Sequence, residues 1–251
     1  MQKNTTNSPL LGVFDSGVGG FSVYKRIREV TQANVVYYGD CARAPYGNRE
    51  ESEIREFVKE DIRFLQDENV THFVNACNSM SVITTNRLLQ ECSVPEDRYT
   101  DMIRAFQRHA SFDKEAKVLL VATHATIRSG VYQDVLHKKG VTCFEYEYID
   151  LAGAIERNVQ EEELMAIIME GMKYAQEKKV THIVYGCTHY PLVHDLFLIA
   201  ATKVRWKGEY VDPGIYVAEE VRGWNLFGER LFTPHASKDT PAFMKAMIAF
   251  L

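Results

Sequence analysis

Two segments of this 251-residue chain have similar sequences, an echo that limits the possible folds more than any other feature. "THFVNACNS" begins at Thr71 and "THIVYGCTH" at Thr181, so Thr-His, an apolar residue, Val and Cys fall in register. Short apolar runs bounded by small or polar residues are typical of buried strands. In both copies a cysteine, Cys77 or Cys187, follows the expected carboxyl end of the strand. The echo predicts a duplicated fold with one thiol at an equivalent place in each half.

Weaker similarities extend the duplication. "LLGVFDSG" from Leu10 pairs with "VLLVATHAT" from Val118, and "NVVYYGD" from Asn34 with "VTCFEYEYID" from Val141. Between these runs lie stretches with apolar residues at helical spacing, such as residues 50–69 and 155–179. Strands that alternate with helices predict parallel sheets, whose ligands bind at the carboxyl ends of the strands. We therefore expect an α/β fold of two similar domains with mostly parallel sheets facing a shared cleft.

The C-terminal stretch has no counterpart in the repeat, so we expect it to pack back on the first half. This gives a first domain of residues 1–98 and 212–251, which carries Asp15 and Cys77, and a second domain of residues 99–211, which carries Cys187 and His189.

Composition excludes several classes of protein. Five scattered cysteines without a C-x-x-C pair form neither a disulfide framework nor a structural zinc site. A net charge of −5 and the lack of a basic patch argue against nucleic acid, so an anionic ligand must be captured by local donors. No apolar run could span a membrane, and no signal peptide is evident. We expect a cytoplasmic protein in which Met1 to Pro9 form a frayed polar lead-in.

Two glycine-containing segments could hold an anion. "FDSGVGGFSV" from Phe14 follows a predicted strand and opens into a predicted helix, whose first N–H groups can bind an anion. Its spacing matches neither the dinucleotide fingerprint nor a P-loop, so a turn capped by Asp15 or Ser16 explains it equally well. "YGDCARAPYGNR" from Tyr38 is an aperiodic loop that either carries function or is a surface turn in which Tyr46 packs without a ligand.

The cysteines of the echo are the strongest candidates for chemistry. Cys77 taken alone is explained as a core residue, because free cysteine is among the most buried residue types. Small polar residues follow both thiols and could begin helices, whose N-termini stabilise thiolates. His189 either tunes Cys187 or makes an ordinary polar contact. Two thiols across a cleft suit removal of a proton from one face of a carbon and its return to the other. The remaining cysteines lack this setting, and we expect them to be structural: Cys41, Cys92 and Cys143.

At these residues the chain resembles the glutamate racemases of the aspartate/glutamate racemase family. The matching motifs, in order along the chain, are "DSGVGG", "GDCARAPYG", "ACNS", "ATHATIRSGVY" and "GCTHYPL". The similarity continues to "LFTPHASKDTPAFMKAMIAFL" at the C-terminus and covers nearly the whole chain. "DSGVGG" and "APYG" favour the glutamate branch over the aspartate branch.

The resemblance implies two similar α/β domains and a cofactor-independent isomerase, without a metal, that interconverts L- and D-glutamate and supplies D-glutamate for bacterial peptidoglycan. Its partner would be this small substrate, and a homodimer is left open. By similarity, the two catalytic acid/bases would be Cys77 and Cys187, assisted by Asp15, His189 and Glu156. The substrate's ammonium and carboxylates would be held by Asp15, Ser16, Tyr46, Gly47, Asn78, Ser79, Thr126, Thr188 and His189.

The chain departs from the family pattern beside the first thiol and between the domains. Ser79 stands where threonine is usual, and Met80 replaces a small residue, which would add bulk near the cleft. "VPEDRYTDMIRAFQRHA", residues 94–110, lacks the usual apolar run and proline. We expect the pocket and the crossover to differ at these places. Two smaller departures are Cys41, where threonine is common, and Pro213, where a small residue is common.

Other functions stay open on the residues alone. A thiol hydrolase or amidase could use Cys187 as nucleophile and His189 as base, although a nucleophile needs no second cysteine. A metal site could include Cys77, Cys187 and His189, but a fourth ligand is not evident. The chain could also be a racemase for aspartate or another acidic amino acid, or an inactive relative with a binding or regulatory role.

Overall fold

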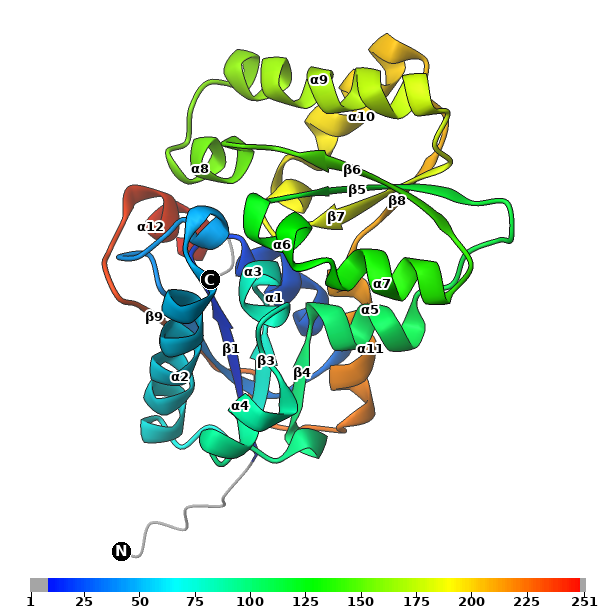
Figure 1. Ribbon diagram of the computed structural model, residues 1–251. Helices are drawn as coiled ribbons and strands as arrows, with labels where there is room; N and C mark the ends of the chain where they lie inside the picture. The colour runs from blue at the N-terminus through cyan, green and yellow to red at the C-terminus, as the bar shows by residue number, and fades with distance from the viewer. Residues whose placement is uncertain (1–8, 249–251) are drawn as a thin grey trace, which may run out of the picture.

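Two parallel sheets form the framework of the computed structural model of the protein, which describes residues 9–248 (Figure 1). The first sheet has five strands in the order β4-β3-β1-β2-β9, and the second has four in the order β6-β5-β7-β8. Neighbouring strands within both sheets run parallel. The predicted α/β fold with two similar halves is therefore confirmed. The expected polar lead-in, Met1 to Pro9, lies outside the described residues except for Pro9 itself.

The first half contains the five-stranded sheet and the helices around it (Figure 1). Its strands are β1 (Leu10–Asp15), β2 (Asn34–Gly39), β3 (His72–Asn75), β4 (Tyr99–Asp101) and β9 (Phe232–Ala236). Its helices are α1 (Gly20–Val30), α2 (Glu51–Asp67), α3 (Asn78–Ser81), α4 (Asn86–Glu91), α5 (Met102–His109), α11 (Pro213–Gly223) and α12 (Pro241–Ile248), with single 3₁₀ turns η1 (Tyr46–Asn48) and η2 (Glu96–Arg98).

The second half contains the four-stranded sheet. Its strands are β5 (Lys117–Ala122), β6 (Thr142–Glu147), β7 (His182–Gly186) and β8 (Glu209–Val211). Its helices are α6 (His124–Ser129), α7 (Val131–Lys138), α8 (Leu151–Glu156), α9 (Glu161–Lys178) and α10 (His194–Val204), with the 3₁₀ turn η3 (Tyr190–Val193) before α10.

The duplication extends to strand order and to single hydrogen bonds. The order β4-β3-β1-β2 in the first sheet corresponds to β8-β7-β5-β6 in the second. At the start of β3, the Thr71 hydroxyl accepts the N–H of Leu10 over 3.0 Å, and at the start of β7 the Thr181 hydroxyl accepts the N–H of Lys117 over 3.0 Å. Each repeated threonine therefore ties its strand to the first residue of the neighbouring central strand. This shared register brings the end of each strand, and the cysteine after it, to the same edge of its sheet.

The crossover between the halves is built from β4 and α5. Tyr99–Asp101 were expected to begin the second domain, but they pair with β3, so the first sheet extends beyond the expected boundary at residue 98. Asp101 then caps α5 by accepting the N–H of Arg104 over 2.7 Å. The segment expected to depart from the family pattern therefore contains a buried strand and a capped helix. α5 packs against α11, which follows the return from the second half.

The segment expected to be helical over residues 155–179 forms two helices. α8 ends at Glu156 and α9 begins at Glu161, and between them Asn158 has a φ of 51°. Asparagine tolerates this left-handed conformation better than most residues, because its short side chain bonds locally. The break leaves Glu156 at a helix end that faces the first half. None of the helices in residues 9–248 has both the length and the apolarity needed to cross a bilayer.

The C-terminal segment returns to the first half. β9 pairs with β2, and the ring of Phe243 in α12 lies 5.4 Å from that of Phe21 and 6.2 Å from that of Tyr37, centroid to centroid. These aromatic contacts join the last helix to the core under β1 and β2. The segment that lacks a counterpart in the repeat therefore completes the first sheet.

Candidate active site

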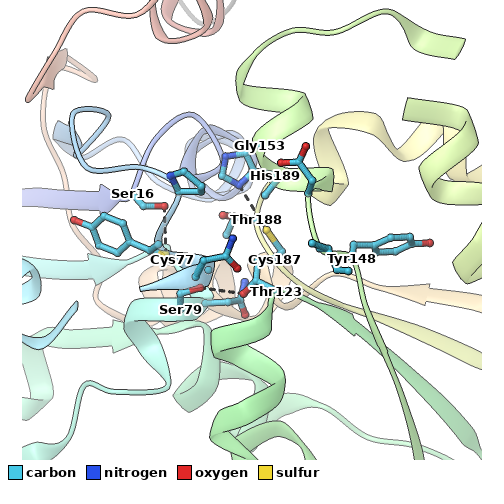
Figure 2. A pocket seen from close by; sticks show the side chains of 17 residues that line it. Ser16, Cys77, Ser79, Thr123, Tyr148, Gly153, Cys187, Thr188 and His189 are labelled. Carbon is cyan, nitrogen blue, oxygen red and sulfur yellow. Dashed lines mark hydrogen bonds between the residues drawn. The ribbon is translucent and has the colours of Figure 1, made fainter. Parts of the chain in front are cut away.

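A pocket lies where the carboxyl ends of the two sheets face each other (Figure 2). Both halves contribute to its walls, and both cysteines of the sequence echo, Cys77 and Cys187, line it. A cleft between two domains, lined by polar and apolar side chains, is a common form of small-molecule site. The predicted cleft between two similar halves is therefore present, with one thiol from each half.

Cys77 reaches the pocket from the turn between β3 and α3. It is the N-cap residue of α3 and only 5% exposed, and its Sγ lies 3.6 Å from Oγ of Ser16. Burial raises the pKa of the Cys77 thiol, and the nearby Asp15 carboxyl raises it further. Cys77 is accordingly a neutral thiol at neutral pH, the form that donates a proton.

Cys187 reaches the same pocket from the other half, directly after β7. Its Sγ lies 3.6 Å from Nδ1 of His189, whose Nε2 lies 2.7 Å from Oε1 of Glu156. Burial acts to lower the pKa of His189, but the contacts with Cys187 and Glu156 outweigh burial and hold this pKa well above its usual value. Burial also opposes ionisation of Glu156, yet His189 outweighs burial and lowers its pKa. The second half therefore presents a thiol, a protonated imidazole and a carboxylate in a row.

Asp15 ties the "DSGVGG" turn to the segment that carries Cys187. Its carboxyl is fully buried at the end of β1; Oδ1 accepts the N–H of Gly17 over 2.8 Å, and Oδ2 accepts the Thr188 hydroxyl over 3.1 Å. Burial raises the pKa of Asp15, while the positive charge of His189 opposes this rise. Asp15 thus lies behind the pocket wall and joins the two halves.

The glycines of the same turn allow the halves to approach closely. A Cβ on Gly17 would lie 2.1 Å from Oε1 of Glu156, and one on Gly19 would lie 2.4 Å from Oγ1 of Thr188. The N–H of Val18 donates to Oε1 of Glu156 over 2.9 Å. The anion that this turn binds is therefore a carboxylate of the protein itself, supplied by the opposite half.

Hydroxyl and amide groups line the wall between the thiols. Oδ1 of Asn78 accepts the Tyr132 hydroxyl over 2.6 Å, and the Ser79 and Thr123 hydroxyls lie 3.1 Å apart. Thr123 in turn donates to Thr126 over 3.2 Å. Among the described residues, the buried Nδ2 of Asn78 is a donor without a hydrogen-bond partner. These are the local donors that a protein of negative net charge needs to hold an anionic ligand.

The "GDCARAPYG" loop places Tyr46 in the pocket wall. Tyr46 is only 1% exposed, and its hydroxyl donates to Asp40, which is fully buried. Arg43 bonds both Asp40 and Glu60, and its Nη2 lies 3.3 Å from Oδ1 of the buried Asp61. The loop is therefore held by a buried charge cluster, and the interpretation of it as a surface turn is wrong.

Most residues expected at the site from the sequence lie together there. The pocket is lined by Ser16, Tyr46, Gly47, Cys77, Asn78, Ser79, Cys187, Thr188 and His189. Three others contact lining side chains without lining the pocket themselves: Asp15, Thr126 and Glu156. Met80 was expected to add bulk near the cleft, but it is fully buried in the core of the first half.

Other residues of the pocket wall were missed from the sequence. Thr123, Tyr148 and Asp150 follow the ends of β5 and β6, and Asn48 lies in η1. The position of the first three at strand carboxyl ends was the signal that could have found them. The cysteines expected to be structural do not line this pocket.

Paired thiols on two sides of one small pocket, with an imidazole and carboxylates behind them, define a two-domain α/β protein equipped to move protons at a carbon atom. In residues 9–248, no three His, Cys, Asp or Glu side chains gather as ligands of a metal ion.

Comparison with known proteins agrees with this class. The family model for Asp/Glu/Hydantoin racemases matches residues 11–207, and the chain belongs to this family. Glutamate racemase 3 of Caldanaerobacter subterraneus subsp. tengcongensis is 30% identical over 241 residues, which are 94% of this chain and 86% of that protein. The crystal structure of glutamate racemase from Aquifex pyrophilus is 29% identical, with a TM-score of 0.78 over 96% of this chain and 94% of that one. The glutamate racemase of Francisella tularensis, solved with D-glutamate, is 24% identical and shares the fold, with a TM-score of 0.83 over 98% of this chain and 94% of that one.

Proposed function

We propose that this protein is a glutamate racemase that interconverts L- and D-glutamate by a two-thiol mechanism without a cofactor. The observation that carries the proposal is the placement of Cys77 and Cys187 in one pocket, each contributed by a different half. Relatives named glutamate racemase, such as that of Aquifex aeolicus at 34% identity over 73% of this chain, support the choice of substrate.

Each thiol carries out one of the two proton transfers. Cys77 is neutral and can donate a proton, and Cys187 lies on the other side of the pocket with its Sγ 3.6 Å from Nδ1 of His189. In one direction Cys187 removes the α-proton and Cys77 returns a proton to the opposite face. In the reverse direction the roles exchange, so both enantiomers use the same pair.

The contacts support the positioning and binding roles that we propose for the other residues. Glu156 holds His189, and Asp15 orients Thr188 next to Cys187. The substrate's carboxylates and ammonium are assigned to polar groups in the pocket wall and directly behind it: Asp15, Ser16, Tyr46, Gly47, Asn78, Ser79, Thr126, Thr188 and His189. As a source of D-glutamate, the protein would serve peptidoglycan synthesis in the cytoplasm, where a homodimer is a further proposal that light scattering would test.

Proton exchange tests the function directly. With L-glutamate in deuterated water and no added pyridoxal phosphate, we expect loss of the circular dichroism signal together with incorporation of deuterium at the α-carbon. The same assay with aspartate tests the alternative substrate. Deuterium exchange with aspartate but not with glutamate would show that aspartate is the substrate. A lack of exchange with both amino acids would contradict the racemase proposal. A thiol hydrolase would release a cleaved product and leave the α-proton in place.

Replacing Glu156 with glutamine is expected to slow racemisation about 10- to 100-fold, the equivalent of the 1.5–3 kcal/mol of a hydrogen bond to a charged group. The amide keeps the atoms that face Val18 and His189 but loses the negative charge. The pKa of His189 should fall towards its usual value, as measured by NMR titration of the imidazole.

The pH dependence of stability follows from the same contact. The raised pKa of His189 gives stabilisation that is complete below the unfolded pKa near 6.5 and is lost as the pH rises through the folded value. Glu156→Gln should bring the folded pKa of His189 closer to the unfolded value, so the stabilisation should be lost over a narrower pH range. Urea unfolding at a series of pH values measures this loss. Glu220→Gln, which removes a Glu–His contact of 2.8 Å with His109 far from the pocket, is the matched control. Equal effects of the two variants on racemisation would contradict the role of Glu156.

A further inference from the structure

A buried amide ends the strand that leads to Cys77. Asn75 is the last residue of β3 and is fully buried between Val74 and Ala76. A buried amide is costly unless it forms hydrogen bonds, so its partners indicate its purpose. Oδ1 accepts the N–H of Cys77 over 3.1 Å, and Nδ2 donates to Oγ1 of Thr84 over 3.3 Å. Asn75 therefore binds the backbone of the residue that carries the first thiol.

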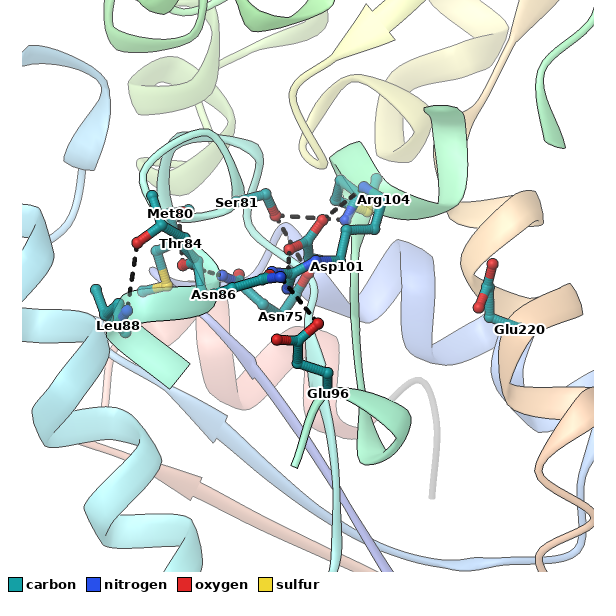
Figure 3. A network of polar contacts seen from close by, with 12 residues as sticks. Asn75, Met80, Ser81, Thr84, Asn86, Leu88, Glu96, Asp101, Arg104 and Glu220 are labelled. Atoms are coloured by element: carbon teal, nitrogen blue, oxygen red, sulfur yellow. Dashed lines mark hydrogen bonds and ion pairs between the residues drawn. The ribbon is translucent and has the colours of Figure 1, made fainter. Parts of the chain in front are cut away.

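Two hydroxyls complete the support of this turn (Figure 3). Oγ of Ser81 donates to the carbonyl of Cys77 over 2.7 Å, and Oγ1 of Thr84 donates to the carbonyl of Met80 over 2.9 Å. Together with Asn75, they hold both the N–H and the C=O of Cys77 through side chains. We call Asn75, Ser81 and Thr84 the Cys77 support cluster.

The support cluster is anchored to the rebuilt crossover. In the pairing of β3 with β4, Asn75 lies opposite Asp101, and the N–H of Met102 donates to Oγ of Ser81 over 3.4 Å. Asp101 is almost fully buried, and its Oδ2 lies 3.1 Å from Nη1 of Arg104. The same arginine extends the polar contacts outward to Asn86 over 2.6 Å (Figure 3). The segment expected to depart from the family pattern thus contacts the turn that carries Cys77 through Ser81 and the pairing of β4 with β3.

The second thiol is supported by a different kind of contact. Tyr185 occupies the position in the repeat that corresponds to Asn75. Its ring stacks on that of Tyr210 at 5.5 Å and meets the edge of Phe197 at 5.1 Å, and its hydroxyl lies 2.9 Å from Nδ1 of His194. Aromatic packing supports the strand before Cys187, whereas a buried hydrogen-bonded amide supports the strand before Cys77.

We infer that Asn75 is a positioning residue that sets the place of Cys77 alone and leaves Cys187 unaffected. Asn75 does not line the pocket, so it acts on the reaction only through the turn that it binds. The expected effect on the reaction rate rests on the proposed function. The placement of the Cys77 thiol can be measured without it.

The test compares Asn75→Leu with the parent protein in two measurements. The substitution keeps the branching and the number of side-chain heavy atoms and removes both amide contacts. Alkylation by iodoacetamide, followed for each thiol by peptide mass spectrometry, should become faster at Cys77 and stay unchanged at Cys187, because a loosened turn exposes the buried thiol. For glutamate, kcat should fall about 10- to 100-fold and KM should stay within about twofold, because only the proton donor is displaced.

Two further variants make the result decisive. Asn86→Ala removes an amide at the exposed end of the same contacts and should leave both thiols and kcat at parent values. Thr84→Val removes the partner of Nδ2 and the bond to the Met80 carbonyl but leaves the bond between Oδ1 of Asn75 and the N–H of Cys77. It should act like Asn75→Leu to a smaller extent, and it carries the test if Asn75→Leu does not fold. If Asn75→Leu leaves the ratio of the Cys77 alkylation rate to the Cys187 alkylation rate unchanged, the inference is overturned. If the parent protein fails to racemise glutamate, the proposed function falls while the alkylation ratio still decides the role of Asn75.

Discussion

Replacing either Cys77 or Cys187 with serine is expected to reduce racemisation by about 10²- to 10⁴-fold, the range of a positioned acid or base. A serine hydroxyl is far less acidic than a thiol and cannot exchange a proton with a carbon acid at neutral pH. Racemisation of L-glutamate followed by circular dichroism measures the effect. Cys92→Ser, which changes a thiol away from the pocket, should keep the parent rate. A parent rate in either active-site variant would show that the two-base assignment is wrong.

The two variants should also differ from each other. A protein with one thiol can remove a proton and return it only on the face where that thiol lies. Each variant should therefore exchange the α-proton of one enantiomer with deuterated water, without inversion, and leave the other enantiomer unchanged. Cys77→Ser and Cys187→Ser should show opposite preferences, measured by NMR with each pure enantiomer. The same preference in both variants would contradict thiols on opposite faces.

Replacing Arg43 with methionine is expected to destabilise the fold by about 3–5 kcal/mol, the usual cost of leaving a buried charge without its partner. Asp40 and Asp61 are both fully buried, and Arg43 bonds each of them. The guanidinium also lies 4.0 Å from the ring centre of Phe57, against which a methionine could still pack. Urea unfolding measures the loss in free energy.

The loss of unfolding free energy in Arg43→Met should grow as the pH rises. Burial raises the pKa of Asp61 well above its usual value, Asp40 adds to the rise, and Arg43 opposes it. The parent already keeps on Asp61 a proton that the unfolded carboxyl releases near pH 3.9, and without Arg43 the folded pKa rises further. The loss relative to the parent therefore grows once the pH exceeds the folded pKa of Asp61 in the parent. Arg87→Met is the matched control, since Arg87 is exposed and pairs with Glu91 at 3.3 Å, and this change should matter by about 0–1 kcal/mol. Equal losses in the two variants would contradict the buried cluster.

The strand ends and both thiols were predictable because the two copies of the repeat align residue by residue, from the threonine at the start of each strand to the cysteine after it. A one-residue shift in a strand reverses its side chains, so a matched Thr-His start implied a matched cysteine. The partners behind the thiols were less accessible. Glu156 reaches His189 only because the expected long helix breaks after α8, and this break depends on Asn158 adopting a left-handed conformation.

Met80 shows why neighbours of a motif are difficult to place. The sequence put it beside Asn78 and Ser79, but successive residues of a helical turn point about 100° apart. α3 is a single turn, so Asn78 and Ser79 face the pocket while Met80 enters the core. β4 was missed for another reason: Tyr99–Asp101 carry no strand pattern of their own, and pairing with β3 determines their conformation.

The hydroxyls of Ser79 and Thr123, one from each half, already bond to each other in the pocket wall. Thr123 donates to Thr126, so Ser79 supplies the proton of this bond, and a ligand carboxylate that takes the same proton replaces an existing bond. That exchange offsets about 0.5–1.5 kcal/mol of the new contact. Measured affinity will therefore understate the strength with which the pocket holds its ligand. The same exchange loosens one tie between the halves whenever a ligand arrives, and it restores that tie when the product leaves.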